Sequence, residues 1–352
     1  MPNKTSTFNP NVKKDFFSNL NLFIQSHTAL MALIIAAILY VITIIVNPKS
    51  FNAVAIGNII LLTIILSMPA AGQTMVLIGG GMDFSVGAVM SATAVLTTYT
   101  MKGENGHFVI VLILALAIGA AVGFLNGVCC VKIGLPAMIV TMAISNIVTR
   151  MQYILTQGVL SGKASPLFSA SVKNKIFGVI PMIVIYAAII WPIVFYLLKR
   201  SRFGKQIYMI GNNANAARLN GVRVTKIQVL TYVFSGMLSA FAGMLGAAYM
   251  STARCQIFDD YAYMSLIAVI IGGTTFAGGS GTYEGSIAGS LVMVLLSNLL
   301  TALNPTQPVR NVLNAVILIL LQFFIIAEKQ SVSKESSVIV KKQSVNKEAQ
   351  HV

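Results

Sequence analysis

Asp83 is a lone carboxylate in an apolar part of the chain, and it follows three consecutive glycines, Gly79 to Gly81. Glycine lacks a Cβ atom and permits a helix to break, and backbone groups freed at a break can serve a ligand only where protein or a cavity surrounds them. One interpretation is that Gly80, Gly81 and Asp83 form a helix break beside a path for a solute. The other is that Asp83 caps the following helix through backbone N–H groups.

Six other strongly polar side chains also lie within apolar stretches. They are Asn58, Gln73, Asn126, Asn146, Arg150 and Gln152. In hydrocarbon, a polar side chain costs free energy unless it faces protein or water, so such residues mark helix contacts or a path. Asn146 and Arg150 are four residues apart and share a helix face. These groups either hydrogen-bond the hydroxyls of a neutral polar solute or hold neighbouring helices together, and the sequence leaves both open.

The chain shows no residue pattern for catalysis, metal binding or cofactor binding. It has no Ser/His/Asp set and no pair of membrane carboxylates that would form a proton relay. Cys129, Cys130 and Cys255 are odd in number and the histidines are scattered, which suggests neither a disulfide framework nor a metal site. We therefore expect a protein that is not an enzyme and binds no metal or cofactor of its own.

The composition identifies the class of protein. Of the 352 residues, 56% are apolar and 9% are charged, whereas soluble globular proteins carry about 25% charged residues. The apolar residues run continuously without alternation, which argues against a β-barrel and for helices of about 20 residues that cross a membrane. The net charge of +15 fits loops that face anionic lipid better than nucleic-acid binding.

An all-α, multi-pass protein with ten membrane spans is therefore predicted. The spans cover residues 28–46, 53–78, 84–101, 107–128, 135–155, 177–198, 229–250, 263–277, 286–303 and 312–327. A cytoplasmic segment, residues 1–27, precedes the transmembrane domain of residues 28–328, and a tail, residues 329–352, is expected to be disordered. With a cytoplasmic N-terminus, 16 Lys and Arg residues fall inside and seven outside. The positive-inside rule therefore favours cytoplasmic N- and C-termini.

Residues 199–227 form a loop between two spans that carries seven basic and no acidic side chains. Its centre, residues 212–219, is rich in Ala and Asn, contains no Pro and is long enough for two helical turns. Gly211 and Gly221 bracket this piece and are predicted to start and stop a helix. Such a helix offers a handle for a cytoplasmic partner. The alternative is an ordinary loop that obeys the positive-inside rule.

A second Gly-rich stretch, residues 271–285, shares an Ile-Gly-Gly beginning with residues 78–84. Transporters often contain internal repeats with broken helices, so the two stretches are either parts of a repeat or the second is a tight turn between closely packed helices. The second stretch lacks the Lys and the spacing of a phosphate-binding P-loop. Nothing in the chain is predicted to bind ATP.

Together these motifs resemble the sugar-permease family of ATP-binding-cassette importers, the group that contains the ribose permease. The resemblance runs in consistent order over residues 28–328. It rests on residues 79–87 (GGGMDFSVG), 127–137, 204–205, 210–222 (IGNNANAARLNGV) and 268–281 (AVIIGGTTFAGGSG). Family members usually carry an aliphatic residue in place of Phe84 and often an acidic residue near Asn213 or Ala214, so this loop departs from the pattern in being wholly basic.

The resemblance implies the membrane subunit of an importer in the bacterial cytoplasmic (inner) membrane. A second copy or a related permease would complete the pore, separate cytoplasmic ATPase subunits would use ATP, and an extracytoplasmic binding protein would deliver the sugar. The ATPase would contact a loop that includes Gly211, Asn212, Asn213, Ala214, Ala217, Arg218 and Gly221.

The identity of the solute is left open by the sequence. A pentose such as ribose is the expected cargo, with hexoses, inositol and a sugar-like signalling molecule as other choices. Two other classes of protein are the alternatives. One is an ion-coupled secondary transporter of small polar solutes, which would need a coupling-ion site. The other is a membrane scaffold without transport activity.

Overall fold

The computed structural model describes residues 28–159, 162–176, 178, 180–303, 309, 312 and 316. The chain divides into two compact units, residues 1–299 and 300–352, and the helix bundle belongs to the first. The predicted cytoplasmic segment 1–27 and tail 329–352 lie outside the described residues. So does the tenth predicted span, apart from Val312 and Val316.

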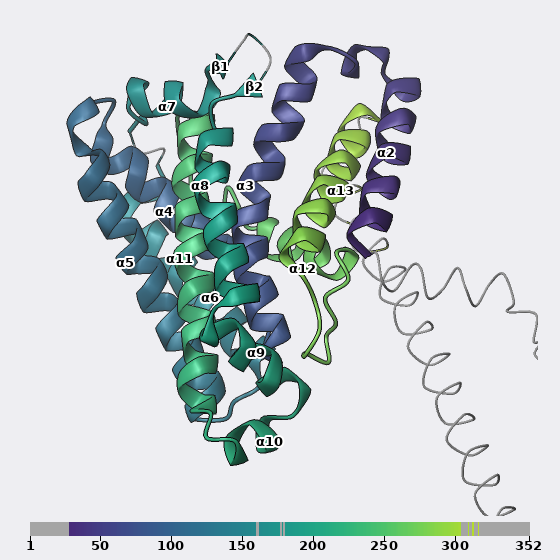
Figure 1. Ribbon diagram of the computed structural model, residues 1–352. Helices are drawn as coiled ribbons and strands as arrows, with labels where there is room; N and C mark the ends of the chain where they lie inside the picture. Colours follow the sequence, from purple (N-terminus) through teal and green to yellow (C-terminus); the bar gives the residue numbers. More distant parts are fainter. Residues whose placement is uncertain are drawn as a thin grey trace, which may run out of the picture. The chain divides into compact units, whose positions relative to one another are not determined.

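The described residues form helices and one small hairpin (Figure 1). The α-helices are α2 (Thr28–Val46), α3 (Ala53–Ile78), α4 (Val86–Met101), α5 (Phe108–Gly127), α6 (Ala137–Thr156), α7 (Pro166–Lys173), α8 (Val184–Phe195), α9 (Arg202–Asn212), α10 (Ala214–Leu219), α11 (Val224–Met250), α12 (Tyr261–Ile271) and α13 (Tyr283–Ala302). Short 3₁₀ turns are η1 (Pro48–Ser50) and η2 (Asn105–His107), and π-helical segments are η3 (Val128–Lys132) and η4 (Tyr196–Arg200). Strands β1 (Lys175–Ile176) and β2 (Ile180–Pro181) pair antiparallel, with Ile176 opposite Ile180.

Nine of the ten predicted spans fall on described residues, and each coincides with a helix or a bent pair of helices. In the described part of the chain, six helices are long and apolar enough to cross a membrane. The pair Val184–Arg200 and Arg202–Asn212, bent by 58°, would make a seventh. Helices α4 and α12 are apolar but shorter, with 16 and 11 residues. The prediction of a helical, multi-pass membrane protein is therefore confirmed.

Three predicted boundaries are wrong. The sixth span, predicted from residue 177, begins at Val184 because strand β2, Ile180–Pro181, pairs with β1 just before it. The seventh, predicted from residue 229, begins at Val224, whose side chain is buried against Ile210, Ala217 and Val222. The eighth, predicted to end at residue 277, ends at Ile271, where two glycines follow.

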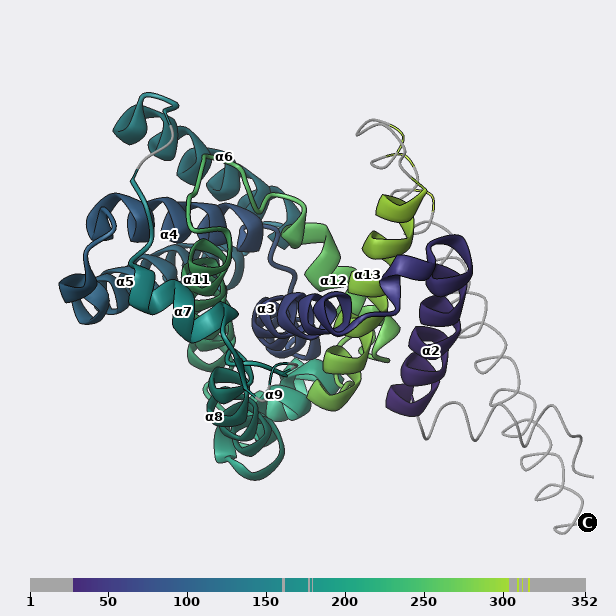
Figure 2. The ribbon, with the colours of Figure 1, turned by 90° about the horizontal axis from the view of Figure 1, so that it is seen from above.

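Helix α11 lies in the middle of the bundle, and α3, α4 and α5 pack along it (Figure 2). Three glycines of α5 at spacing four, Gly119, Gly123 and Gly127, face α11. A Cβ atom added to Gly123 would lie 2.2 Å from the carbonyl oxygen of Tyr232, and one added to Gly119 would lie 2.3 Å from that of Gly236. The two backbones therefore touch, as small residues at this spacing permit in membrane helices.

Gly123→Ala should separate α5 from α11 and lower the thermal unfolding midpoint of the purified protein. The added methyl group meets backbone, which cannot rotate away, so we expect a loss of about 2 kcal/mol or more. Gly106→Ala is the matched control, because a Cβ atom there meets nothing within 4 Å. Equal midpoints for the two variants, measured in the same detergent, would contradict this close contact.

Candidate functional site

The glycines at residues 79–81 interrupt the helical path between α3, which ends at Ile78, and α4, which begins at Val86. Gly80 has a φ of +83°, a left-handed conformation that glycine adopts without strain. Gly81 allows the Tyr232 hydroxyl to approach, since a Cβ atom there would lie 2.5 Å from it. Backbone groups freed at the break find partners in other helices: the Gln228 side-chain amide donates to the Gly79 carbonyl oxygen at 3.0 Å.

Asp83 is the centre of a buried hydrogen-bond network that joins the break to neighbouring helices. Its Oδ1 accepts from the backbone N–H and the hydroxyl of Ser85, at 2.9 and 2.6 Å. Its Oδ2 accepts from the Ser235 hydroxyl of α11 at 2.9 Å. The Asn126 amide of α5 donates to Ser85 Oγ at 2.7 Å, and the Gln73 amide of α3 donates to the Asp83 carbonyl oxygen. We call these five residues the Asp83 network.

The Asp83 network contains no cation, and its carboxylate is 1% exposed. Hydrogen bonds from the surrounding donors take the place of water around this buried carboxyl group. The side-chain oxygens of Gln73 and Asn126 accept no hydrogen bond from the described residues. Two buried acceptor atoms beside the break, Gln73 Oε1 and Asn126 Oδ1, thus have no described hydrogen-bond donor.

The hydrogen bonds of Asp83 bear on the two interpretations of this residue. The bond from the Ser85 N–H forms a turn before α4, whose first helical residue is Val86. The other carboxylate oxygen reaches across to Ser235 on α11. A helix cap would use backbone N–H groups of the first turn alone. Asp83 thus orders the break and also ties it to another helix.

Only two of the predicted intramembrane polar residues, Gln73 and Asn126, join Asp83. Asn58 is exposed near the start of α3. Asn146 is exposed on α6, where its amide donates to the Met142 carbonyl of its own helix at 3.0 Å, and Arg150 is exposed on the same helix. The structure does not bring these three residues to the break.

Several partners of the break were missed by the sequence analysis. Ser235 binds the carboxylate, Tyr232 and Gln228 contact the glycines, and Thr141 Oγ1 accepts from the Phe84 N–H at 3.1 Å. They belong to helices far away in the sequence. One sequence feature could have indicated Ser235. Gly72 is a small residue where α3 meets α11, and a Cβ atom there would lie 2.5 Å from the Ser235 Cα.

A cavity of about 270 Å³ lies against the glycines of the break. Its polar wall includes Gln228, Thr231, Tyr232 and Cys130. Among the residues that the structure describes, no charged side chain lines it, and Asp83 is outside it. Amide, hydroxyl and backbone groups in an uncharged cavity can exchange hydrogen bonds with a neutral polar molecule.

The basic segment after α8 is mostly helical. Helix α9 begins after Ser201, whose hydroxyl accepts from the Gly204 N–H at 3.1 Å, and it continues through Gly211. Helix α10 starts at the cap residue Asn213, whose side chain accepts from the Ala216 N–H at 3.0 Å. The prediction that Gly211 starts the short helix is therefore wrong, because Asn213 supplies the cap. Gly221, with a φ of +78°, follows the end of α10 as predicted.

Gly211 lies where three backbone segments meet. A Cβ atom there would lie 1.8 Å from the Ile78 carbonyl oxygen and 2.3 Å from the Gly279 nitrogen. The Gly279 N–H donates to the Ile78 carbonyl oxygen at 2.9 Å. We call Ile78, Gly211 and Gly279 the three-way joint. It connects the last turn of α9, the end of α3 just before the break, and the second Gly-rich stretch.

Side chains of α9 reinforce the three-way joint. The Asn212 amide donates to the Gly279 carbonyl oxygen at 3.3 Å, and the Tyr208 hydroxyl donates to the Gly281 carbonyl oxygen at 2.7 Å. Lys199 in η4 forms an ion pair with Glu284 at the start of α13. The segment is thereby attached to both Gly-rich stretches and to the helix that follows the second.

Helix α10 has a buried face and an exposed face. Ala217 packs against Ile210 and Val222. Arg218 is exposed, and Leu219 is 90% exposed. Leu219 is not among the contact residues that the sequence predicts; its signal is a large apolar side chain next to an Arg in an aqueous loop. A basic and an apolar side chain side by side on a surface can dock a protein partner.

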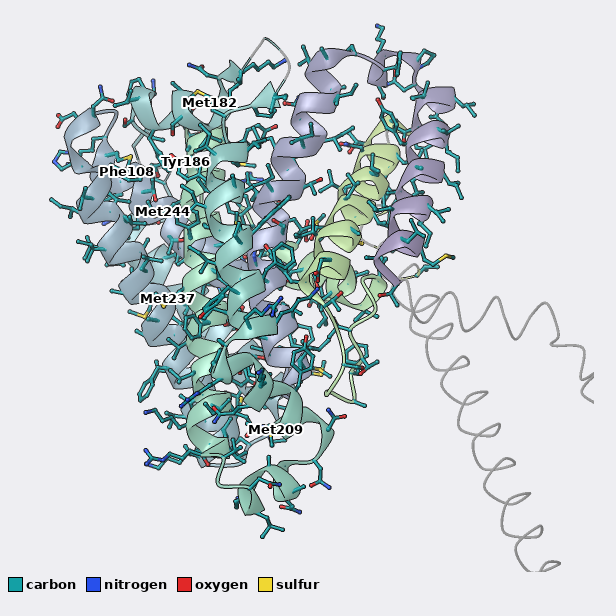
Figure 3. All side chains as sticks on the ribbon, viewed as in Figure 1. Phe108, Met182, Tyr186, Met209, Met237 and Met244 are labelled. Carbon is teal, nitrogen blue, oxygen red and sulfur yellow. The ribbon has the colours of Figure 1, made fainter. Side chains whose placement is uncertain are left out.

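The opposite end of the bundle collects other loops. Figure 3 shows Met209 of α9 at one end and Phe108 and Met182 toward the other.

Backbone and side-chain bonds join the loops there. The Gly103 N–H donates to the Lys163 carbonyl oxygen at 2.8 Å, and the Ala164 N–H donates to the Ser251 carbonyl oxygen at 2.9 Å. The Lys173 ammonium donates to Ser251 Oγ at 2.7 Å. With the predicted cytoplasmic termini, the loops that hold Lys102, Lys163, Lys173 and Arg254 all fall on the outer side of the membrane. The structure brings these loops together.

A family profile described as branched-chain amino acid transport system / permease component matches residues 55–322. The chain is similar to the ribose import permease protein of Escherichia coli K12, with 29% identity over 298 residues that cover 82% of this chain and 91% of the relative. It is similar to the fructose import permease protein of Rhizobium meliloti, with 28% identity over 297 residues that cover 81% of each chain.

It is also similar to the galactose/methyl galactoside import permease protein of Haemophilus influenzae, with 30% identity over 273 residues that cover 72% of this chain and 81% of the relative. No solved structure shows significant similarity to this chain.

Proposed function

The chain belongs to the family of branched-chain amino acid transport system / permease components, and from this premise we propose that it is the membrane subunit of an ATP-binding-cassette importer for a monosaccharide. The names of the three relatives favour sugar over amino acid, since they refer to ribose, fructose and galactose. A cavity whose described lining carries no charged side chain also suits a neutral sugar better than a zwitterionic amino acid. A pentose such as ribose is the proposed cargo.

The three-way joint is the observation that carries this proposal. An importer without an ATP site must receive the free energy of ATP through contact with another subunit. Arg218 and Leu219 offer the contact surface on α10. Gly211, one short helix away, touches both Ile78 and Gly279 without a side chain between them. A displacement of α9 and α10 therefore has to displace the break as well.

The break is the proposed gate of the path. Movement of Ile78 would shift residues 79–85 and with them the Asp83 network, which reaches α5 and α11. The unused acceptors of Gln73 and Asn126 would then become accessible to sugar hydroxyls. The ATPase must bind the two arrangements with different free energies, because a partner that binds both equally shifts neither.

We also propose ten spans with cytoplasmic N- and C-termini. Two observations support this arrangement: the 16 to seven excess of Lys and Arg on the inner side, and the gathering of the predicted outer loops at one end of the bundle. The remaining partners are a second permease chain, identical or related, that completes the pore, and an extracytoplasmic sugar-binding protein. Specificity for one sugar would rest largely with the binding protein.

Reconstitution tests the proposed function. Liposomes that contain this chain should accumulate ribose when the cognate ATPase, ATP and the binding protein are all present, and not when any one of them is omitted. Accumulation by the chain alone under an ion gradient would identify a secondary transporter. A complete system that moves none of ribose, hexoses or inositol would favour a scaffold.

A further inference from the structure

A groove of about 680 Å³ lies between the ends of α5 and α11, beside α10. Four basic residues line it, Lys132, Arg218, Arg223 and Lys226, and all four are exposed. We call it the basic groove. We propose that the basic groove binds an anionic phospholipid, with the headgroup against the four cations and the acyl chains along the helices below them.

The positive charge of the basic groove has no internal counterpart. No Asp or Glu occurs in the sequence between Glu104 and Asp259, the stretch that supplies all four cations. In the described part of the chain the ion pairs join Glu104 to His107 and Lys199 to Glu284, and neither lies at this groove. No described acidic side chain pairs with these four cations, and clustered cations at the membrane surface favour anionic headgroups.

The walls of the basic groove are apolar and belong to membrane-spanning helices. Phe124 and Val128 are four residues apart on one face of α5 and η3, and Val229, Leu230 and Val233 form the facing stripe on α11. Both helices are long and apolar enough to cross a membrane. Phe124 is 54% exposed. The groove thus has an apolar surface that can contact acyl chains, and this surface adjoins the four basic side chains.

The glycine contact between α5 and α11 explains where the groove begins. Gly119, Gly123 and Gly127 hold the two backbones together. After Gly127 the chain continues as the π-helical segment Val128–Lys132, whose residues carry full side chains. The close approach therefore ends at Gly127, and the two helices leave a crevice beyond it.

A lipid fits this combination better than the acidic surface of a soluble subunit. A soluble partner can satisfy the cations at the rim, but it cannot insert into a crevice between two membrane-spanning helices. A phospholipid carries both parts, an anionic headgroup and apolar chains. Because Arg218 and Val222 contribute to the groove, a bound headgroup would also restrain α10. The assignment of this groove to the cytoplasmic leaflet rests on the proposed function. The binding of an anionic phospholipid does not.

Native mass spectrometry of the purified full chain, titrated with cardiolipin, tests the proposal. The triple variant Lys132→Gln, Arg223→Gln, Lys226→Gln should bind cardiolipin roughly 100-fold more weakly, because each surface cation contributes about fivefold. The control triple variant is Arg200→Gln, Arg202→Gln, Lys205→Gln. It also removes three exposed positive charges, from residues outside the groove, and leaves the groove intact. Its affinity should therefore stay within about threefold of the unmodified chain.

A second pair of variants tests the apolar walls without changing charge. Phe124→Ala should weaken cardiolipin binding severalfold, since it removes part of a wall. Leu125→Ala should leave it unchanged, because Leu125 is equally exposed, at 53%, but lies outside the groove. Phosphatidylcholine, which has no net charge, should bind far more weakly than cardiolipin to the unmodified chain.

Three results would overturn the proposal. Equal losses in the two triple variants would show a diffuse basic surface instead of a site. Equal binding of phosphatidylcholine and cardiolipin would remove the role of the cations. Reduced ATPase association in the first triple variant, with cardiolipin affinity unchanged, would show that the groove docks a protein. None of these measurements depends on sugar uptake, so the proposed function can fail while lipid binding stands.

Discussion

Gly211→Ala should yield an importer that hydrolyses ATP but takes up little sugar. The added methyl group would lie 1.8 Å from the Ile78 carbonyl oxygen and 2.3 Å from the Gly279 nitrogen. Both neighbours are backbone, so α9 must move away and the three-way joint must open. Forcing a methyl group into packed backbone costs about 1–3 kcal/mol. We expect uptake in proteoliposomes to fall at least about tenfold, which corresponds to about 1.4 kcal/mol.

ATPase activity measured in the same proteoliposomes separates uncoupling from failed assembly. Gly211→Ala leaves Arg218 and Leu219 on the exposed face of α10 unchanged, so the ATPase should still bind and turn over. Arg218→Glu is the complementary variant, since it leaves the joint intact and should weaken ATPase binding. Gly106→Ala is the steric control, because its Cβ atom meets nothing within 4 Å. Normal uptake by Gly211→Ala would refute the role of the joint.

Asp83→Ala should cause the second large effect, loss of both folding stability and uptake. Four donors, the Ser85 N–H and hydroxyl, the Ser235 hydroxyl and the Asn126 amide, would lose a buried acceptor. Each unpaired buried group costs about 1–3 kcal/mol, so the total is about 3 kcal/mol or more. The amount of folded protein should decrease along with uptake. It is measured as the monodisperse peak in size-exclusion chromatography of the detergent-solubilised membranes.

Asp83→Asn isolates the charge from the hydrogen bonds. The amide keeps the shape of the side chain, its oxygen can replace Oδ1, and its nitrogen can donate to the Ser235 hydroxyl. We therefore expect near-normal amounts of folded protein but an uptake reduced by about tenfold, or about 1.4 kcal/mol. Glu104→Gln is the control, since that carboxylate is exposed and outside the network. Unchanged uptake in Asp83→Asn would show that Asp83 only orders the turn before α4.

The two Gly-rich stretches, residues 78–84 and 271–285, contact each other in the structure. The hydrogen bond from the Gly279 N–H to the Ile78 carbonyl oxygen connects them directly, and Gly211 lies against both. In the sequence they are separated by almost 200 residues, and they show only a short Ile-Gly-Gly likeness. Whether or not they are parts of an internal repeat, both stretches contact Gly211, so a displacement of α9 would disturb both.

Composition and local pattern alone determined the class of protein, the approximate places of the nine spans that fall on described residues, the break at Gly79 to Gly81 and the position of a basic helical segment. These features depend on residues that are neighbours in the chain: continuous apolar runs, absent Cβ atoms and clustered charge. For the same reason the helix at residue 213 was placed only approximately. Gly211 and Asn213 are both reasonable starts, and the side-chain cap of Asn213 decides between them.

Tertiary structure alone decided which polar residues act together. Gln73 and Asn126 joined Asp83, while Asn58, Asn146 and Arg150 did not, although all six are polar groups in apolar sequence. Ser235, more than 150 positions from Asp83, completed the network. The physical reason is that a helix buries one face and exposes another. Which face meets α11 depends on glycine contacts between distant segments, and no local pattern encodes that choice.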